Sequence, residues 1–122
     1  MNIKDTKGTI YPTLPDSNGF YFEDENEELL NIKTKEYDNG NLIKQVELKK
    51  GKIAIVRELD RKESKKAYEI AGEWKEDKDR LATALIAVST KIDDKEILME
   101  DVLLFKAKEF NRLSIATQSL NF

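Results

Sequence analysis

The chain has 122 residues, a formal net charge of −3, and neither histidine nor cysteine. It therefore lacks the commonest general base, the commonest transition-metal ligand and all thiolate or disulfide chemistry, so we expect no catalytic residue, cofactor or metal. Acidic residues outnumber lysine and arginine by 24 to 21, which argues against binding to a nucleic-acid backbone. The length fits one domain. No apolar run approaches the roughly 18 residues of a membrane span, and the first residues lack the apolar core of a signal peptide, so a cytoplasmic protein is expected.

Residues 1–28 are predicted to form an irregular acidic arm. They contain both prolines, an Asn-Gly turn signal and an acidic run at 23–28, and these features do not favour a regular helix or strand. Tyr11, Leu14 and the aromatic residues at 20–22 are too apolar for a fully solvated tail, so the arm is expected to dock either on the domain or on a partner. The acids lack the spacing of a calcium-binding loop and are interpreted as solvated charges.

Residues 29–58 are predicted to form a three-stranded antiparallel meander. Apolar and polar residues alternate here with period two, which is typical of strands with one buried face. The strands are expected at about 30–38, 41–49 and 52–58, with turns at Asn39-Gly40 and Lys50-Gly51. The alternation places Leu42, Lys44, Val46 and Leu48 on one face and Ile53, Ile55 and Arg57 on another.

Residues 60–122 show the apolar period of helices. Asp60 is expected to cap the first helix, with Glu63 reaching back as in a capping box. The first apolar stripe consists of Ala67, Ile70, Ala71 and Trp74, and the second of Leu81, Ala84, Leu85, Val88 and Ile92. A charged break at 75–79 separates them, either as a turn between two helices or as a kink in one long helix.

The stretch from Ile92 to Phe110 is expected to contain a turn at Ile92–Lys95 and a short helix whose Val102 and Phe105 point inward. A last helix then carries the stripe Phe110, Leu113, Ala116, Thr117 and Leu120. Together these elements predict an α+β fold. A small antiparallel sheet of about three strands is followed by a helical C-terminal half of three to four helices, and residues 29–122 form a single domain.

Three apolar residues are candidates for contact with a partner: Trp74, Ile115 and Phe122. Trp74 falls on a helical stripe, where packing in the core is the simpler interpretation. Ile115 and Phe122 lie seven residues apart and off the stripe of the last helix. They either cover the sheet or meet a partner.

The order of segments from residue 42 onward resembles the tail assembly chaperones of long-tailed bacteriophages and their prophages. The sheet-forming segment exits through Arg57, Leu59 and Glu63 into helices. An alanine-rich helix is followed by Thr90–Ile97, which reads "TKIDDKEI", then by Glu100–Phe105 and Lys108–Leu113 in the family's order and spacing. The likeness covers about two thirds of the chain and does not account for the arm.

This resemblance implies a non-enzymatic role. Members of the family coat the long helical tape measure protein, keep it soluble and help to recruit tail tube subunits. They act in the cytoplasm of the bacterial host, are often also made in a longer frameshifted form, and leave before the virion is complete. The implied partners are therefore the tape measure protein and the tail tube protein, without nucleic acid or membrane, and self-association is also possible in such a module.

Two other classes stay open. One is a different prophage-encoded interaction module, for example an inhibitor, whose basic partner would suit the acidic arm. The other is a small enzyme that works with carboxylates, which would need convergent acids in a concave site. Genes for a tail tube protein upstream and a tape measure protein downstream would favour the chaperone over the first of these.

Overall fold

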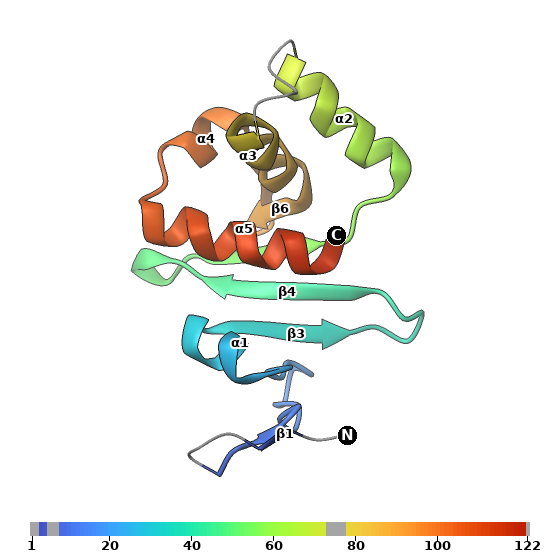
Figure 1. Cartoon of the computed structure of the whole chain (residues 1–122), viewed down its shortest axis with the longest axis vertical. Coiled ribbons are helices and arrows are strands. Elements are labelled where there is room, and N and C mark those ends of the chain that lie inside the picture. Colours follow the sequence, from blue (N-terminus) through green and yellow to red (C-terminus); the bar gives the residue numbers. More distant parts are fainter. Residues whose placement is uncertain (1–2, 5–7, 73–77, 122) are drawn as a thin grey trace.

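A computed structural model describes residues 3–4, 8–72 and 78–121, and its centre is a five-stranded antiparallel sheet (Figure 1). The strands lie in the order β3-β4-β5-β6-β7. Their bounds are β3 (Ile32–Glu36), β4 (Leu42–Glu47), β5 (Ile53–Arg57), β6 (Thr90–Ile92) and β7 (Lys95–Glu96). Strands and helices thus share one fold, as predicted for an α+β protein.

The first three strands confirm the predicted meander, but the predicted number of about three strands is wrong, because β6 and β7 extend the sheet. They form a hairpin around Asp93 and Asp94, whose φ angles are 49° and 67°. Asp93 fastens this turn to β5, since its amide donates to the Ile53 carbonyl (2.9 Å) and its Oδ1 accepts from the Ile53 amide (3.0 Å). Strands of three and two residues are too short for period two to be recognised in the sequence.

Side chains of one face of the sheet are buried and those of the other are partly solvated, as in many antiparallel sheets. The buried face carries Ile32, Thr34, Lys44, Val46, Ala54, Val56 and Thr90. The register pairs Val46 with Ala54 and Lys44 with Val56, so these side chains share the face predicted for Lys44 and Val46. Ile53, Ile55 and Arg57 are half-buried on the opposite face, as the alternation also predicted.

The described residues contain five α-helices, where three to four were predicted. They are α1 (Glu25–Leu30), α2 (Arg61–Ala71), α3 (Lys78–Ser89), α4 (Met99–Leu103) and α5 (Ala107–Asn121), and a 3₁₀ turn, η1 (Lys49–Gly51), joins β4 to β5. The additional helix is α1, which begins within the segment expected to be irregular. Asp24 caps it, because Oδ1 of Asp24 accepts a hydrogen bond from the Glu27 amide (2.8 Å).

The start of α2 follows the predicted capping box. Oδ1 of Asp60 accepts from the Glu63 amide (2.8 Å), and Oε1 of Glu63 accepts from the Asp60 amide (3.3 Å). The helix ends at Gly72, whose φ is 66°. Because α3 is a separate helix, the charged break between the two stripes divides two elements.

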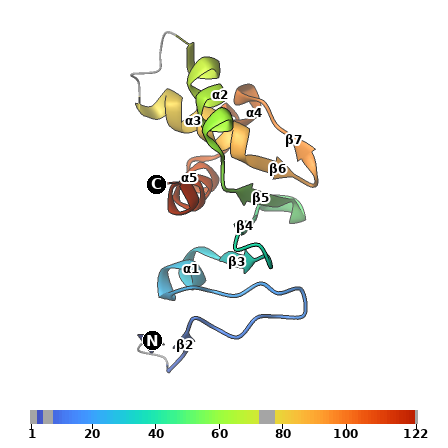
Figure 2. The ribbon, with the colours of Figure 1, turned by 90° about the vertical axis from the view of Figure 1, so that its right-hand side faces the viewer.

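Helices α3 and α5 cover the buried face of the sheet, and α2 packs on the outer side of α3 (Figure 2). Ile86 and Ala87 of α3 join the main core with Val46, Val56 and Leu113. On its other side, α3 packs Ala84 and Leu85 against two alanines of α2, Ala67 and Ala71. Ile70 was predicted on the buried stripe of α2 but is 39% exposed, because it lines an open cavity beside α3 and α4.

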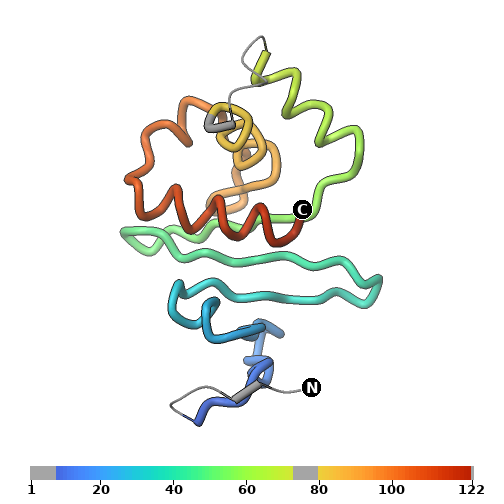
Figure 3. The backbone as a smooth tube through the Cα atoms, in the orientation of Figure 1, coloured from blue at the N-terminus to red at the C-terminus, as the bar shows by residue number. Residues whose placement is uncertain are grey.

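The N-terminal segment continues the sheet beyond β3. Tyr21 forms a β-bridge with Thr34, and residues 12–22 fold back on themselves as a loop that we call the edge loop. Before it, β1 (Ile3–Lys4) pairs with β2 (Ile10–Tyr11). The described residues of this segment (3–4 and 8–28) thus include two short strands and the start of α1, and the tube in Figure 3 places residues 8–28 at the end of the molecule opposite α2.

Candidate functional site

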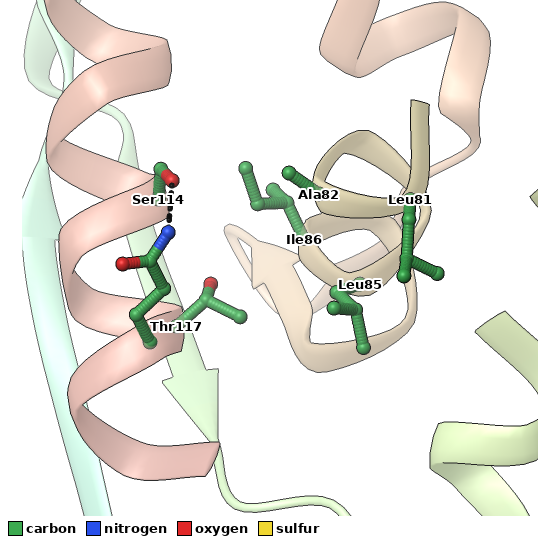
Figure 4. Close-up of a pocket in the computed structure, with 7 residues that line it drawn as sticks. Leu81, Ala82, Leu85, Ile86, Ser114 and Thr117 are labelled. Carbon is green, nitrogen blue, oxygen red and sulfur yellow. Dashed lines mark hydrogen bonds between the residues drawn. The ribbon is translucent and has the colours of Figure 1, made fainter. Parts of the chain in front are cut away.

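An apolar groove runs between α3 and α5 (Figure 4). Its volume is about 310 Å³, and we call it the α3–α5 groove. Its lining consists of Leu81, Ala82, Leu85 and Ile86 from α3, and of Ser114, Thr117 and Gln118 from α5. Positions 81, 82, 85 and 86 fall on one side of a helix, and so do 114, 117 and 118, because neighbours on a helix face are three or four residues apart.

The floor of the α3–α5 groove is buried and its rim is polar. Leu85, Ile86 and Thr117 form the floor, and the Thr117 hydroxyl donates to the Leu113 carbonyl in its own helix (2.8 Å). At the rim, the Gln118 amide donates to the Ser114 hydroxyl (3.3 Å), as the dashed line in Figure 4 shows. A groove of this kind can hold an apolar side chain and demands no hydrogen bond from it.

A second cavity, of about 570 Å³, lies between α2, the β6–β7 hairpin and α4. We call it the β6–α4 cavity. Ala87, Val88 and Thr90 are among its lining residues, and Leu98 and Leu103 stand at its edge with exposed fractions of 67% and 66%. Exposed large apolar side chains beside a hollow are typical of an interaction site.

Charged residues also line the β6–α4 cavity, and two of them form an ion pair. Arg57 of β5 pairs with Glu63 of α2 and donates to the Val88 carbonyl through Nη2 (3.4 Å). The hydrogen bond from Arg57 lowers the pKa of Glu63, and the same bond raises the pKa of Arg57. Oγ1 of Thr90 is buried and has no hydrogen-bond partner among the described residues, which leaves an uncompensated polar atom next to this cavity.

A small third cavity, of about 100 Å³, lies between α1 and α5 and contains a buried ion pair. Lys44 of β4 and Glu27 of α1 are 3% and 7% exposed. The Lys44 ammonium donates to the Glu27 carboxylate, to the Thr34 hydroxyl (3.0 Å) and to the Glu23 carboxylate (3.4 Å). This network anchors the N-terminal segment in the fold, because a charge this deeply buried needs its partners.

Arg112 of α5 makes a second connection to α1. Its guanidinium donates to the carbonyls of Leu30 (2.8 Å), Asn31 (3.3 Å) and Glu47 (2.8 Å). Asn31 is the C-cap of α1 and has a φ of 53°. Arg112 therefore satisfies carbonyls at the end of α1 and ties that helix to β4 and α5.

Of the three residues predicted to meet a partner, only Ile115 is described. It is half-buried, packs against the main core and lines the small cavity between α1 and α5, on a different side of α5 from the groove. Trp74 and Phe122 lie outside the described residues.

The sequence interpretation did not select the residues of the α3–α5 groove. It assigned Leu81 and Leu85 to the core stripe of one helix and Thr117 to the core stripe of the last helix. One available signal was the composition of α3, whose run "LATALIAV" is apolar on more of its circumference than a helix with one buried face requires.

No described group of three or more acidic residues is placed to hold a metal ion. Among the described residues, no helix has the length and apolar character needed to span a bilayer. Comparisons with protein-family models, with curated proteins and with solved structures give no match for this chain.

Proposed function

We propose that this chain is a non-enzymatic binding module of the tail assembly chaperone type, acting in the cytoplasm of a bacterial host and absent from the finished virion. In this role it holds an apolar segment of the tape measure protein in the α3–α5 groove and helps to recruit tail tube subunits. The identity of these partners rests on the resemblance in segment order from residue 42 onward. The observation that carries the binding role is the groove itself.

The shape and chemistry of the α3–α5 groove support this proposal. Its buried floor is formed by Leu85, Ile86 and the internally bonded Thr117, so an occupant gains from the removal of apolar surface from water. An amphipathic helix presents apolar residues at intervals of three and four, and binding of such a helix in a groove between helices is a common mode of recognition.

The size of the groove supports weak, repeated binding. A volume of about 310 Å³ is at the lower end of ligand pockets, which span roughly 300–1,000 Å³. A groove of this size takes few side chains from each turn of a partner helix. Many copies of the chain along one long helix would then act together through avidity, and each copy would remain easy to displace.

Co-expression with a candidate tape measure protein tests the proposal, with the solubility and the co-purification of that protein as readouts. Ala82→Glu places a charge in the α3–α5 groove at a half-buried position. Ala107→Glu is the matched control, because Ala107 is exposed at the first position of α5 and takes no part in the groove. Phe122→Asp tests in parallel the contact predicted from the sequence.

The expected result is that the native chain and Ala107→Glu both keep the tape measure protein soluble, while Ala82→Glu reduces its recovery at least about tenfold, as for loss of a contact worth more than 1.4 kcal/mol. If no variant changes recovery, the α3–α5 groove is not the binding surface. If the native chain itself neither dissolves nor retains the tape measure protein, the chaperone role is wrong.

A further inference from the structure

The sequence contains two Asn-Gly pairs, and both lie at turns of the described structure. Asn18-Gly19 belongs to the edge loop, and Asn39-Gly40 lies in the connection between β3 and β4, which we call the β3–β4 turn. Asparagine before glycine is prone to deamidation, because glycine has no side chain to hinder attack of its backbone nitrogen on the asparagine side chain. The surroundings of each pair decide how readily it reacts.

The β3–β4 turn is open to water. Every residue from 36 to 41 is exposed, and the turn projects from the side of the sheet (Figure 1). A Cβ added to Gly40 would meet no atom within 4 Å. Gly19 is more crowded, because a Cβ added there would lie 3.4 Å from the Lys35 side chain. The backbone of Gly40 therefore has more room to move toward a side chain than the backbone of Gly19.

Hydrogen bonding prepares the Asn39 side chain for attack. The Asn41 amide donates to Oδ1 of Asn39 (3.0 Å), and this bond folds the Asn39 side chain along the backbone of Gly40. Attack on the side-chain carbonyl places negative charge on the same oxygen, and an amide that already donates to that oxygen stabilises the charge. The Asn18 side chain makes no hydrogen bond to any residue that the structure describes.

A fixed negative charge opposes the same reaction in the edge loop. Oδ1 of Asp16 accepts from the amides on both sides of Gly19, which are those of Asn18 (2.8 Å) and Phe20 (3.1 Å). These bonds lower the pKa of Asp16, so its carboxylate is charged at neutral pH. Negative charge that develops on the Gly19 nitrogen is therefore repelled. In the β3–β4 turn the acid nearest in sequence, Asp38, accepts from none of the described amides.

The two glycine amides themselves are held alike. The Gly40 amide donates to the Tyr37 carbonyl (2.9 Å), and the Gly19 amide donates to the Asp16 carbonyl (3.0 Å). The attacking nitrogen must give up one such bond in either turn, so this cost does not distinguish the two pairs. The room around the glycine, the donor to the asparagine oxygen and the nearby carboxylate all favour reaction at Asn39.

From these differences we propose that Asn39 is a site of spontaneous deamidation, which proceeds through a cyclic imide with Gly40 and leaves Asn18 mostly unchanged. The Gly40 nitrogen loses its proton to solvent and forms a bond to Cγ of Asn39. The bond between Cγ and Nδ2 then breaks, and the side-chain nitrogen takes up a proton from solvent and leaves as ammonia. Nothing is oxidised or reduced in this step.

Water then opens the imide ring at one of its two carbonyl carbons. Opening at the side-chain carbonyl gives aspartate, and opening at the backbone carbonyl gives isoaspartate, in which the chain continues through the former side chain. Both products add a negative charge to the β3–β4 turn. Isoaspartate also lengthens the backbone, which disturbs the bonds from Gly40 to Tyr37 and from Tyr37 to Asn41. No residue of this turn lines the α3–α5 groove, so the proposal is independent of the proposed function.

Peptide mass spectrometry of the purified full chain, sampled during incubation at neutral pH, tests the proposal. Deamidation exchanges an amino group for a hydroxyl, and the resulting gain in mass is followed separately in the peptides that contain Asn18 and Asn39. Fragmentation that distinguishes isoaspartate from aspartate reports the imide route. The same chain unfolded in urea is the control for the sequence, because both asparagines precede glycine there without the folded surroundings.

In the folded chain, Asn39 is expected to react at least about tenfold faster than Asn18, a ratio equivalent to about 1.4 kcal/mol in the activation barrier. In urea the two rates are expected to converge. Equal rates in the folded chain, faster reaction at Asn18, or an Asn39 that reacts only after unfolding would each overturn the proposal.

Asp16→Asn tests the role of the charge, because it keeps an oxygen acceptor for the two amides but removes the carboxylate. It is expected to speed deamidation at Asn18 several-fold and to leave the rate at Asn39 unchanged, so Asn39 serves as an internal control in the same sample. Circular dichroism checks that the variant is folded, and Asp16→Ser replaces it if it is not. An unchanged rate at Asn18 in a folded variant would contradict the assigned cause.

Discussion

Removal of one partner of the buried ion pair should destabilise the whole domain. Glu27→Leu leaves the Lys44 ammonium 3% exposed, with Thr34 and the more distant Glu23 as its remaining partners. Loss of one member of a buried pair costs about 3–5 kcal/mol. The Glu23 carboxylate, 3.4 Å from the ammonium, still compensates part of its charge. We therefore expect the free energy of unfolding to fall by about 3 kcal/mol.

The companion variant Lys44→Met should cost a similar amount, because it leaves the Glu27 carboxylate buried without its cation. The double variant restores a neutral, apolar contact of similar volume and should lie within about 1 kcal/mol of the native chain. Urea unfolding followed by circular dichroism measures all four states of this cycle. Glu25→Leu, on an exposed position of the same helix, is the control and should change stability by less than about 0.5 kcal/mol.

Two results would refute this reasoning. Additive losses in the double variant would mean that the two side chains do not depend on each other. A loss below about 1 kcal/mol for Glu27→Leu would mean that α1 is released from the domain at little cost, and that Lys44 then finds water.

Three further measurements test other contacts. Glu63→Gln keeps the capping box but removes the charge that pairs with Arg57. This pair lowers the pKa of Glu63. The stabilisation that the pair gives is therefore complete above the ordinary glutamate pKa and is lost as the pH falls through the lowered pKa. The difference between Glu63→Gln and the native chain is expected to stay below about 1 kcal/mol at pH 7, because the pair is part-exposed. It should shrink as the pH falls below the ordinary glutamate pKa, and a difference that stays constant would contradict the assignment. Asp94→Gly should raise the free energy of unfolding by about 0.5–1 kcal/mol, because glycine adopts the φ of 67° without strain; a melting temperature below that of the native chain would contradict it. Arg112→Lys should lower the free energy of unfolding by about 1–2 kcal/mol, because an ammonium cannot reach all three carbonyls that the guanidinium contacts. The control Arg61→Lys, at an exposed position, should leave the free energy of unfolding unchanged. Urea unfolding measures both variants.

Local patterns in the sequence were sufficient to predict the elements whose apolar residues recur with a clear period. Residues close together in the sequence were enough to predict three features: the meander of β3, β4 and β5, the capping box at Asp60 and Glu63, and the buried stripe of α5. The alternation also placed Lys44 on the face with Val46, although a lysine there contradicts the usual rule for core positions.

The parts that sequence patterns missed depend on distant partners. Lys44 can be buried only because Glu27 lies 17 positions earlier and folds over it, and no local pattern indicates that pairing. The β6–β7 hairpin depends on Ile53, which is 40 positions away from Asp93. The α3–α5 groove and the β6–α4 cavity arise from side chains of elements far apart in sequence, so the residues that line them looked like ordinary core or surface positions.

The bonds of Arg112 have a consequence for the order of folding. They join α5 to the Leu30 carbonyl across 82 positions of the chain, whereas the contacts of Lys44 with Glu23 and Glu27 span 21 and 17 positions. Closure of the longer loop costs more entropy, and such distant contacts form late and slow the overall rate. The three-stranded meander with its N-terminal segment is thus expected to form early. We expect α5 to pack on the sheet later, and that step completes the α3–α5 groove.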